Sequence, residues 1–127
     1  MKKQRTITAA AYRRSAVPEH RLQAAVLRFL DVHAARDVYA FAIPNAARRS
    51  PQLAARMKAE GLRAGVADLC IMLPGCCGWL ELKAGKGGQS DAQKGFEAIC
   101  NRLMHAYEVA HTLDEAITVL KAWGALK

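Results

Sequence analysis

The sequence has no apolar run long enough to cross a bilayer and no Cys-x-x-Cys pair. After the basic start Met1–Arg5 the next segment is short and contains threonines, so we expect no signal peptide and a cytoplasmic location. The four cysteines lie at positions 70, 76, 77 and 100, and the adjacent pair Cys76-Cys77 suits neither a regular disulfide nor a zinc site. These absences exclude a membrane protein and a disulfide or zinc scaffold.

Aromatic and acidic residues are also scarce. Aromatics make up 6% of the chain, which gives few stacking platforms for single-stranded RNA. With 19 Lys and Arg against 11 Asp and Glu, the net charge is +8 and the pI is near 9.7. We therefore expect a polyanionic partner, although the net charge does not distinguish among DNA, RNA and lipid. The Gly-Lys-Ser/Thr order of a nucleotide-binding P-loop is missing, and we expect no small-molecule cofactor.

The chain is long enough for one globular domain. Its 127 residues are 52% hydrophobic, which suits a single core over residues 16–127. Residues 1–15 carry five basic residues and no acid. Such a tail could lie along phosphates, or it could be a solvated tail or an artefact of the chosen start site.

Hydrophobic periodicity and turn residues predict an α/β fold. The expected elements are a helix at 18–35, a strand at 38–43, a helix at 51–60, a hairpin at 66–84, a helix at 91–104, a strand at 106–110 and a helix ending near 123. They form a small mixed sheet of about four strands flanked by helices. Two helices have expected inner faces: Leu22, Val26, Phe29 and His33 in the first, and Phe96, Ile99, Cys100 and Leu103 in the third.

The hairpin is the part of the chain that carries chemistry. Alternation along a strand puts Glu81 and Lys83 on one face of its second strand, and Asp68 lies on the first strand. With a loop over Pro74–Cys77, the positions of opposite residues would sum to 151. Asp68 would then lie opposite Lys83 and beside Glu81. Two carboxylates and an ammonium therefore converge in this prediction.

An aspartate followed by Glu-x-Lys on the next strand is what metal-dependent phosphodiester hydrolysis requires. Carboxylates bind Mg²⁺ through oxygen, and a lysine can orient water or steady developing charge. Taken alone, the pattern fits equally a cross-strand salt bridge on a solvated sheet face.

Five stretches carry a resemblance to a known family: Glu19 with Gln23, Pro44-Asn45, the run Lys58 to Asp68, Leu80 to Lys83, and Ser90 to Gln93. Together they resemble the VRR-NUC (virus-type replication-repair nuclease) domain of the PD-(D/E)xK nuclease superfamily, over about Glu19 to Trp123. Ala67 stands where the family usually has proline before the aspartate. This difference affects backbone stiffness and leaves the ligands intact.

The resemblance implies a restriction-endonuclease-like core and a Mg²⁺- or Mn²⁺-dependent DNA endonuclease. The metal would be held by Asp68, Glu81, the carbonyl of Leu82 and Glu19. Lys83 would position water, and Gln93 would complete the site. Stand-alone members that look similar act as homodimers on branched DNA such as four-way (Holliday) junctions, in phage or prophage settings and in DNA repair. The alternative is a catalytically inactive nucleic-acid-binding module on the same fold.

Two of these site residues also fit purely structural roles at helix starts. Glu19, in the first helical turn, could interact favourably with the helix dipole. Gln93 follows Ser90 by three residues, which is the spacing of a helix capping box. For both residues the structural role and the role in the site stay open.

Basic residues gather before the strand that carries Asp68. This stretch contains one acidic residue, Glu60, and five basic ones: Arg48, Arg49, Arg56, Lys58 and Arg63. Such a run is often a solvated face, but its position favours contact with phosphates near the metal. The expected nucleic-acid-binding set also includes Lys86, in a glycine-rich loop, and Asn45, which could instead cap a turn.

Overall fold

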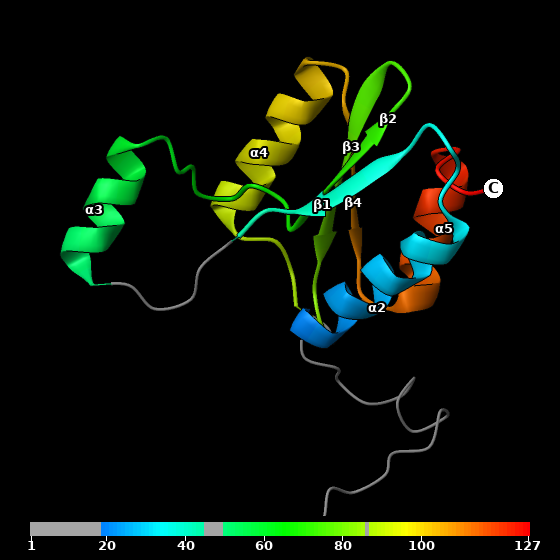
Figure 1. The fold of residues 1–127 in the computed structure, drawn as a ribbon. Helices are drawn as coiled ribbons and strands as arrows, with labels where there is room; N and C mark the ends of the chain where they lie inside the picture. Colours follow the sequence, from blue (N-terminus) through cyan, green and yellow to red (C-terminus); the bar gives the residue numbers. More distant parts are fainter. Residues whose placement is uncertain (1–18, 45–49, 86) are drawn as a thin grey trace, which may run out of the picture.

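A four-stranded mixed sheet organises the computed structural model, which describes residues 19–44, 50–85 and 87–127 (Figure 1). Its elements are α2 (Glu19–His33), β1 (Tyr39–Ala42), α3 (Pro51–Ala59), β2 (Leu69–Leu73), β3 (Cys76–Leu82), α4 (Asp91–Arg102), β4 (Ala106–Ala110) and α5 (Leu113–Ala122). The predicted α/β class and order of elements are confirmed. The basic tail and the predicted contacts Asn45, Arg48, Arg49 and Lys86 lie outside the described residues.

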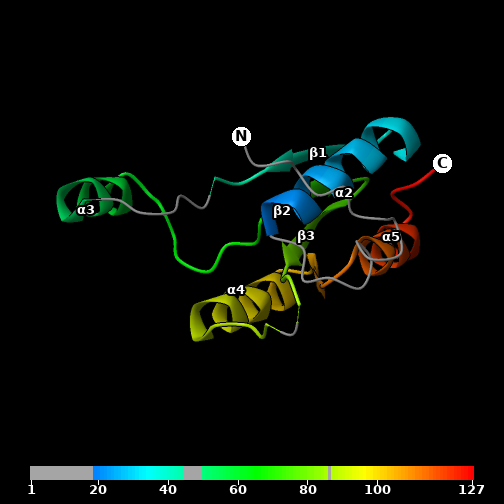
Figure 2. The same ribbon diagram turned by 90° about the horizontal axis from the view of Figure 1, so that it is seen from below.

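The strands lie in the order β1-β2-β3-β4. The pairs β1–β2 and β2–β3 are antiparallel, and β3–β4 is parallel. Helices α2 and α5 share one buried cluster with Leu80 and Leu82 of β3, whereas α4 packs on the other face through Cys100, near Trp79 and Tyr107. Figure 2 shows α4 on the opposite side of the sheet from α2. Because both faces are covered, a polar side chain on β3 must find partners inside the protein.

The hairpin register differs by two residues from the predicted one. Leu73 pairs with Cys76 and Ile71 with Gly78, so the turn is Pro74-Gly75 rather than Pro74–Cys77. Proline presets the first turn position, and Gly75 has φ 87, the positive value that the second position of a type II turn requires. The position numbers of opposite residues therefore sum to 149 and not to 151. One step beyond the paired residues, the same register puts Asp68 opposite Glu81 rather than opposite Lys83.

Two predicted helix faces also need correction. In α2 the third buried residue is Leu30, while His33, the last helical residue, is exposed and stacks on Phe29 with ring centroids 4.4 Å apart. In α4 only Cys100 is buried. Ile99 and Leu103 are exposed, and the chain turns away just beyond them at Met104, which has φ 63. Helical spacing identifies the residues that share one face of a helix. It does not show how far the sheet extends beneath that face.

Helix α3 lies apart from the sheet. Its N-cap is Ser50, whose hydroxyl accepts a hydrogen bond from Leu53 N at 3.1 Å. None of its residues is buried, and Figure 1 shows it projecting from the body of the fold. The helix was predicted correctly, but it does not flank the sheet. Across the described residues, no helix is long and apolar enough to span a membrane.

Candidate active site

Asp68 immediately precedes β2 and is tied to the end of β3. Its Oδ2 accepts a hydrogen bond of 2.9 Å from the backbone N–H of Leu82. The side chain is half-buried, and the backbone carbonyl of Asp68 accepts from Ile43 N at 2.8 Å. These bonds hold the aspartate at the same end of the sheet as Glu81.

Glu81 is the buried carboxyl group of the site. Only 3% of the residue is exposed, and its Oε1 accepts a hydrogen bond of 3.0 Å from Gln93 Nε2. Oε2 is buried too, and no fixed N–H or O–H donor reaches it from the described residues. The carboxyls of Asp68 and Glu81 also interact through a side-chain hydrogen bond, which they can share only when one of them holds a proton.

Burial and a neighbouring carboxyl raise the pKa of Glu81 to about 8. Burial has the larger effect, followed by Asp68; Lys83 opposes the shift and Glu19 adds to it. Because these charges act on one carboxyl, Asp68, Lys83 and Glu19 all lie around Glu81. The alternative of a solvated cross-strand salt bridge does not describe this arrangement, since Glu81 is buried.

Two carboxyl groups side by side, one with a buried oxygen lacking a donor, suit a divalent cation. Such an ion takes oxygen ligands and would replace the proton that the pair otherwise shares. Within the described ranges, however, no three His, Cys, Asp or Glu side chains cluster as metal ligands. The side-chain ligands that fit the group are therefore Asp68 and Glu81, with Glu19 acting through its charge.

Lys83 follows directly after β3. Its backbone N–H donates to the carbonyl of Ala110 on β4 at 3.0 Å, which extends the parallel pairing past the strand end. The side chain is half-buried and runs beside Gly87, where an added Cβ would lie 3.9 Å from Lys83 Cδ. Its ammonium acts on the pKa of Glu81, so the lysine and the carboxyl pair occupy one site.

Glu19 opens α2 and is exposed, with half-buried Gln23 one turn on. Its position in the first turn fits the favourable interaction with the helix dipole. Its charge also adds to the raised pKa of Glu81, so the carboxylate is close enough to act on Glu81 electrostatically. The role at the helix dipole fits the structure, and the role of Glu19 as a metal ligand stays a prediction.

Gly65 fixes the approach to Asp68. It has φ 85, and an added Cβ would collide with the carbonyl of Ala92 and lie 2.8 Å from Gln93 N. The first turn of α4 therefore sits directly on the segment that leads into β2. A side chain at this position would push Gln93 away from Glu81.

Replacement of Gly65 by alanine is expected to cost about 3 kcal/mol of unfolding free energy, since backbone strain and a collision add. Gly61→Ala is the matched control. Gly61 has φ 108 but nothing lies within 4 Å of its added Cβ, so only strain, about 1 kcal/mol, should remain. Urea denaturation of both variants measures the difference. Equal losses would show that the contact with α4 does not matter.

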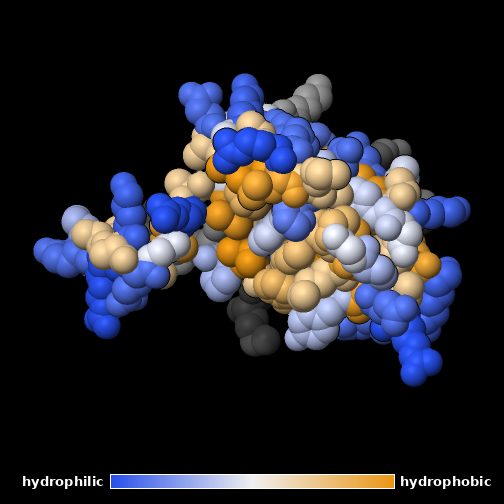
Figure 3. Space-filling view, turned by 90° about the horizontal axis from the view of Figure 1, so that it is seen from above, coloured by the Kyte–Doolittle hydropathy of each residue, from blue (hydrophilic) through white to orange (hydrophobic). Residues whose placement is uncertain are grey.

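Among the predicted DNA-binding cations, those that the structure describes lie on and after α3. Arg56 and Lys58 are exposed on the helix, Arg63 is exposed in the segment that follows, and Arg56 Nε pairs with Glu60 Oε1 at 3.0 Å. Hydrophilic side chains cover most of the projecting part at the left of Figure 3. The structure therefore presents these cations to solvent on the projecting helix and on the segment that leads from it toward Asp68.

A polar network near the site was missed in the sequence. Gln89 Nε2 donates to Tyr107 OH at 3.1 Å and to Glu97 Oε1 at 3.3 Å. Burial raises the pKa of Tyr107 to about 12, and the charge of Glu81 contributes. The alternating pattern of β4 places Tyr107 on the α4 face, but nothing in the sequence marks Gln89 as its partner.

His111 links the loop after Lys83 to α5. Its Nε2 lies 3.3 Å from the carbonyl oxygen of Gly87, and its Nδ1 lies 3.1 Å from Glu115 Oε2. The backbone N–H of His111 is the main cause that lowers the pKa of Glu115. This link was also missed, because nothing in the sequence marks His111 as a partner of Gly87.

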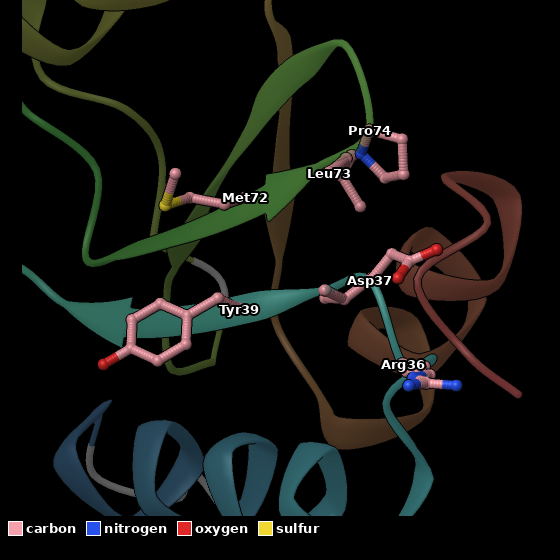
Figure 4. A pocket seen from close by; sticks show the side chains of 7 residues that line it. Arg36, Asp37, Tyr39, Met72, Leu73 and Pro74 are labelled. Carbon is pink, nitrogen blue, oxygen red and sulfur yellow. The ribbon is translucent and has the colours of Figure 1, made fainter.

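A separate groove lies at the other end of β2. Figure 4 shows the residues that line it: Arg36, Asp37, Val38, Tyr39, Met72, Leu73 and Pro74. Leu73 ends β2 at the hairpin turn, whereas Asp68 precedes the strand's first residue. The groove is therefore not part of the Asp68–Glu81 site.

The structure thus places an aspartate before β2 and Glu-x-Lys at the end of β3, on a mixed sheet of four strands. A solved structure described as a VRR_NUC domain protein has this fold. It matches 86% of this chain and 89% of its own with a TM-score of 0.68 and 21% identity. No family model and no curated protein matches the sequence. The resemblance to VRR-NUC domains is confirmed at the level of the fold.

Proposed function

We propose that the protein is a metal-dependent DNA endonuclease that hydrolyses phosphodiester bonds. The observation that carries this proposal is the contact of two carboxyl groups, Asp68 and buried Glu81, beside Lys83 at one end of the sheet. Burying two carboxyl groups side by side costs stability, and such arrangements are typical of functional sites. A nuclease-type fold and a net charge of +8 support DNA as the substrate.

Asp68, Glu81 and the carbonyl of Leu82 would hold Mg²⁺ or Mn²⁺, with Glu19 nearby. When bound, the ion supplies a polarised phosphate and an acidified water. Asp68 is already fixed by the Leu82 N–H, so its carboxylate needs little ordering. Lys83 orients the attacking water or steadies the charge that develops on the phosphate. Gln93 keeps Glu81 in place.

We further propose branched DNA as the preferred substrate and a homodimer as the active form. Two sites related by a two-fold axis suit a symmetric four-way junction. The exposed basic residues of α3 and the following segment supply phosphate contacts outside the site.

Purified protein incubated with a four-way junction, a flap and a linear duplex of matched sequence tests the function. Cleavage with Mn²⁺ or Mg²⁺, strongest on the junction, and none with chelator is the expected result. Binding without cleavage under every condition would favour the inactive nucleic-acid-binding module instead. Cleavage that persists in chelator would contradict the metal requirement.

Lys58→Ala and Arg63→Ala are each expected to weaken DNA binding regardless of sequence. Each lost phosphate contact should reduce the slope of log affinity against log salt by about 0.9. Lys121→Ala on α5, an equally exposed cation on another element, is the matched control and should leave the slope unchanged. Fluorescence anisotropy at several salt concentrations measures the slopes. Identical slopes for all three variants would remove α3 and its neighbour from the DNA-binding surface.

A further inference from the structure

The side-chain amide of Gln93 makes two hydrogen bonds at once. Its Oε1 accepts from the backbone N–H of Ser90 at 2.8 Å, and its Nε2 donates to Glu81 Oε1 at 3.0 Å. Ser90 Oγ in turn accepts from the backbone N–H of Gln93 at 3.2 Å, which completes the capping box of α4. Helix capping and contact with the site therefore occur together.

These bonds allow only one orientation of the amide. A glutamine amide has one acceptor oxygen and one donor NH₂ group. With the oxygen engaged by the Ser90 N–H, the NH₂ group must face the carboxyl of Glu81. A flipped amide would place NH₂ against the N–H of Ser90 and, once Glu81 is ionised, oxygen against oxygen at Glu81, so both attractive contacts would be lost.

We propose that the capping box of α4 orients the carboxyl group of Glu81, with Ser90 and Gln93 acting as positioning residues. The Ser90 N–H sets the amide, the amide holds Glu81 Oε1, and the buried Oε2 is left as the oxygen available at the site. This inference rests on the proposed function for the reaction that Glu81 serves. It changes the expected role of Gln93 from completing the catalytic set to aiming one member of it.

The surrounding contacts hold the capping box in place. Gly65 lets the chain before β2 lie directly against Ala92 and Gln93. On the other side, Gln89 is anchored by its bonds to Tyr107 and Glu97, immediately before Ser90. Neither end of the first turn of α4 can shift without breaking a contact. The Gln93 amide is therefore held in a fixed position against Glu81.

Two replacements of Ser90 separate the backbone donor from the hydroxyl. Ser90→Ala removes the hydroxyl and keeps the N–H that binds Gln93 Oε1. Ser90→Pro removes both, and φ −73 at this position suits proline. Both variants lose the capping hydrogen bond that Gln93 N–H donates to Ser90 Oγ. Only Ser90→Pro should lower kcat, by about tenfold with KM unchanged, because only there is the amide free to turn.

Gln93→Glu tests the other half of the arrangement. Glutamate is itself a capping-box residue and accepts from the Ser90 N–H, so α4 should stay capped. The donor to Glu81 is lost, however, and a carboxyl replaces it. Cleavage should fall about 100-fold while circular dichroism still shows a folded protein. Activity equal to the wild type would show that Gln93 only caps the helix.

The ¹⁵N-labelled side-chain amide of Gln93 gives a readout that does not depend on cleavage. Its signal, assigned by its loss in Gln93→Glu, should shift in Glu81→Ala and in Ser90→Pro and should stay in place in Ser90→Ala. An amide signal unmoved by Glu81→Ala would overturn the inference. If the expected shifts occur but the wild type cuts no DNA with either metal, the proposed nuclease function fails and the orienting role of the capping box is supported.

Discussion

Glu81→Gln is expected to make the metal-free protein more stable at alkaline pH while removing its cleavage activity. Glutamine has the shape of glutamate and carries no charge, and Gln93 Nε2 can still donate to its Oε1. At pH 9 the variant should gain on the order of 2 kcal/mol, the scale of burying an uncompensated polar group in mutational data. This gain should raise the midpoint of thermal unfolding by roughly 8 °C.

The sign of this stability difference follows from the raised pKa of Glu81. Its pKa is about 8 in the folded protein, against an ordinary value of 4.5. Between these values the native state keeps a proton that the unfolded chain has released. The stability of the wild type therefore falls as pH rises from about 4.5 to about 8 and stays reduced above that. At pH 4 the two proteins should be equally stable.

Denaturation in chelator at pH 4 and pH 9 measures this effect. Glu108→Gln is the control, because Glu108 is a glutamate on β4 whose side chain is exposed. It should change stability little at either pH. A Glu81→Gln protein that is less stable than the wild type at pH 9 would contradict the burial of a strained carboxyl pair.

Asp68→Ala is expected to abolish metal-dependent cleavage, by at least about 10³-fold, with folding and DNA binding retained. One of two carboxyl ligands disappears. The Leu82 N–H loses its acceptor, at a cost of about 1–3 kcal/mol, and relief of repulsion with Glu81 offsets part of that loss. Lys83→Ala should show the same pattern, since it loses the cation that orients water.

Asp68→Asn provides the matched control for stability. Its side-chain oxygen still accepts from Leu82 N, so it should be at least as stable as the wild type and still not cut. Single-turnover cleavage with Mn²⁺ gives the rate, anisotropy gives the DNA affinity, and circular dichroism gives the fold. Retained cutting by purified Asp68→Ala protein would show that the assignment of Asp68 is mistaken.

The sequence was sufficient to bring Asp68 and Glu81 together although the predicted register was wrong. An error of two residues is even, so each side chain stays on its own face of the sheet. The turn was misjudged because Cys76 and Cys77 were counted as loop residues, whereas a Pro-Gly pair alone closes it. Alternation is a property of every strand, but register depends on the turn.

Other features depend on contacts between distant parts of the chain. The spacing of Ser90 and Gln93 indicated a capping box, but only the packing of Gly65 against α4 brings that box to Glu81. Likewise, a good N-cap and Pro51 predicted α3, yet nothing local showed that the helix would have no buried side. Local sequence determines where a helix begins, and tertiary packing determines what it touches.

The most direct test is a calorimetric titration of metal-free protein with Mn²⁺, for the wild type and for Glu81→Ala. We expect saturable binding by the wild type and affinity at least about 100-fold weaker in the variant, because one of two carboxyl ligands is gone. Absence of binding by the folded wild type, or equal affinity in both proteins, would contradict a cation site between Asp68 and Glu81.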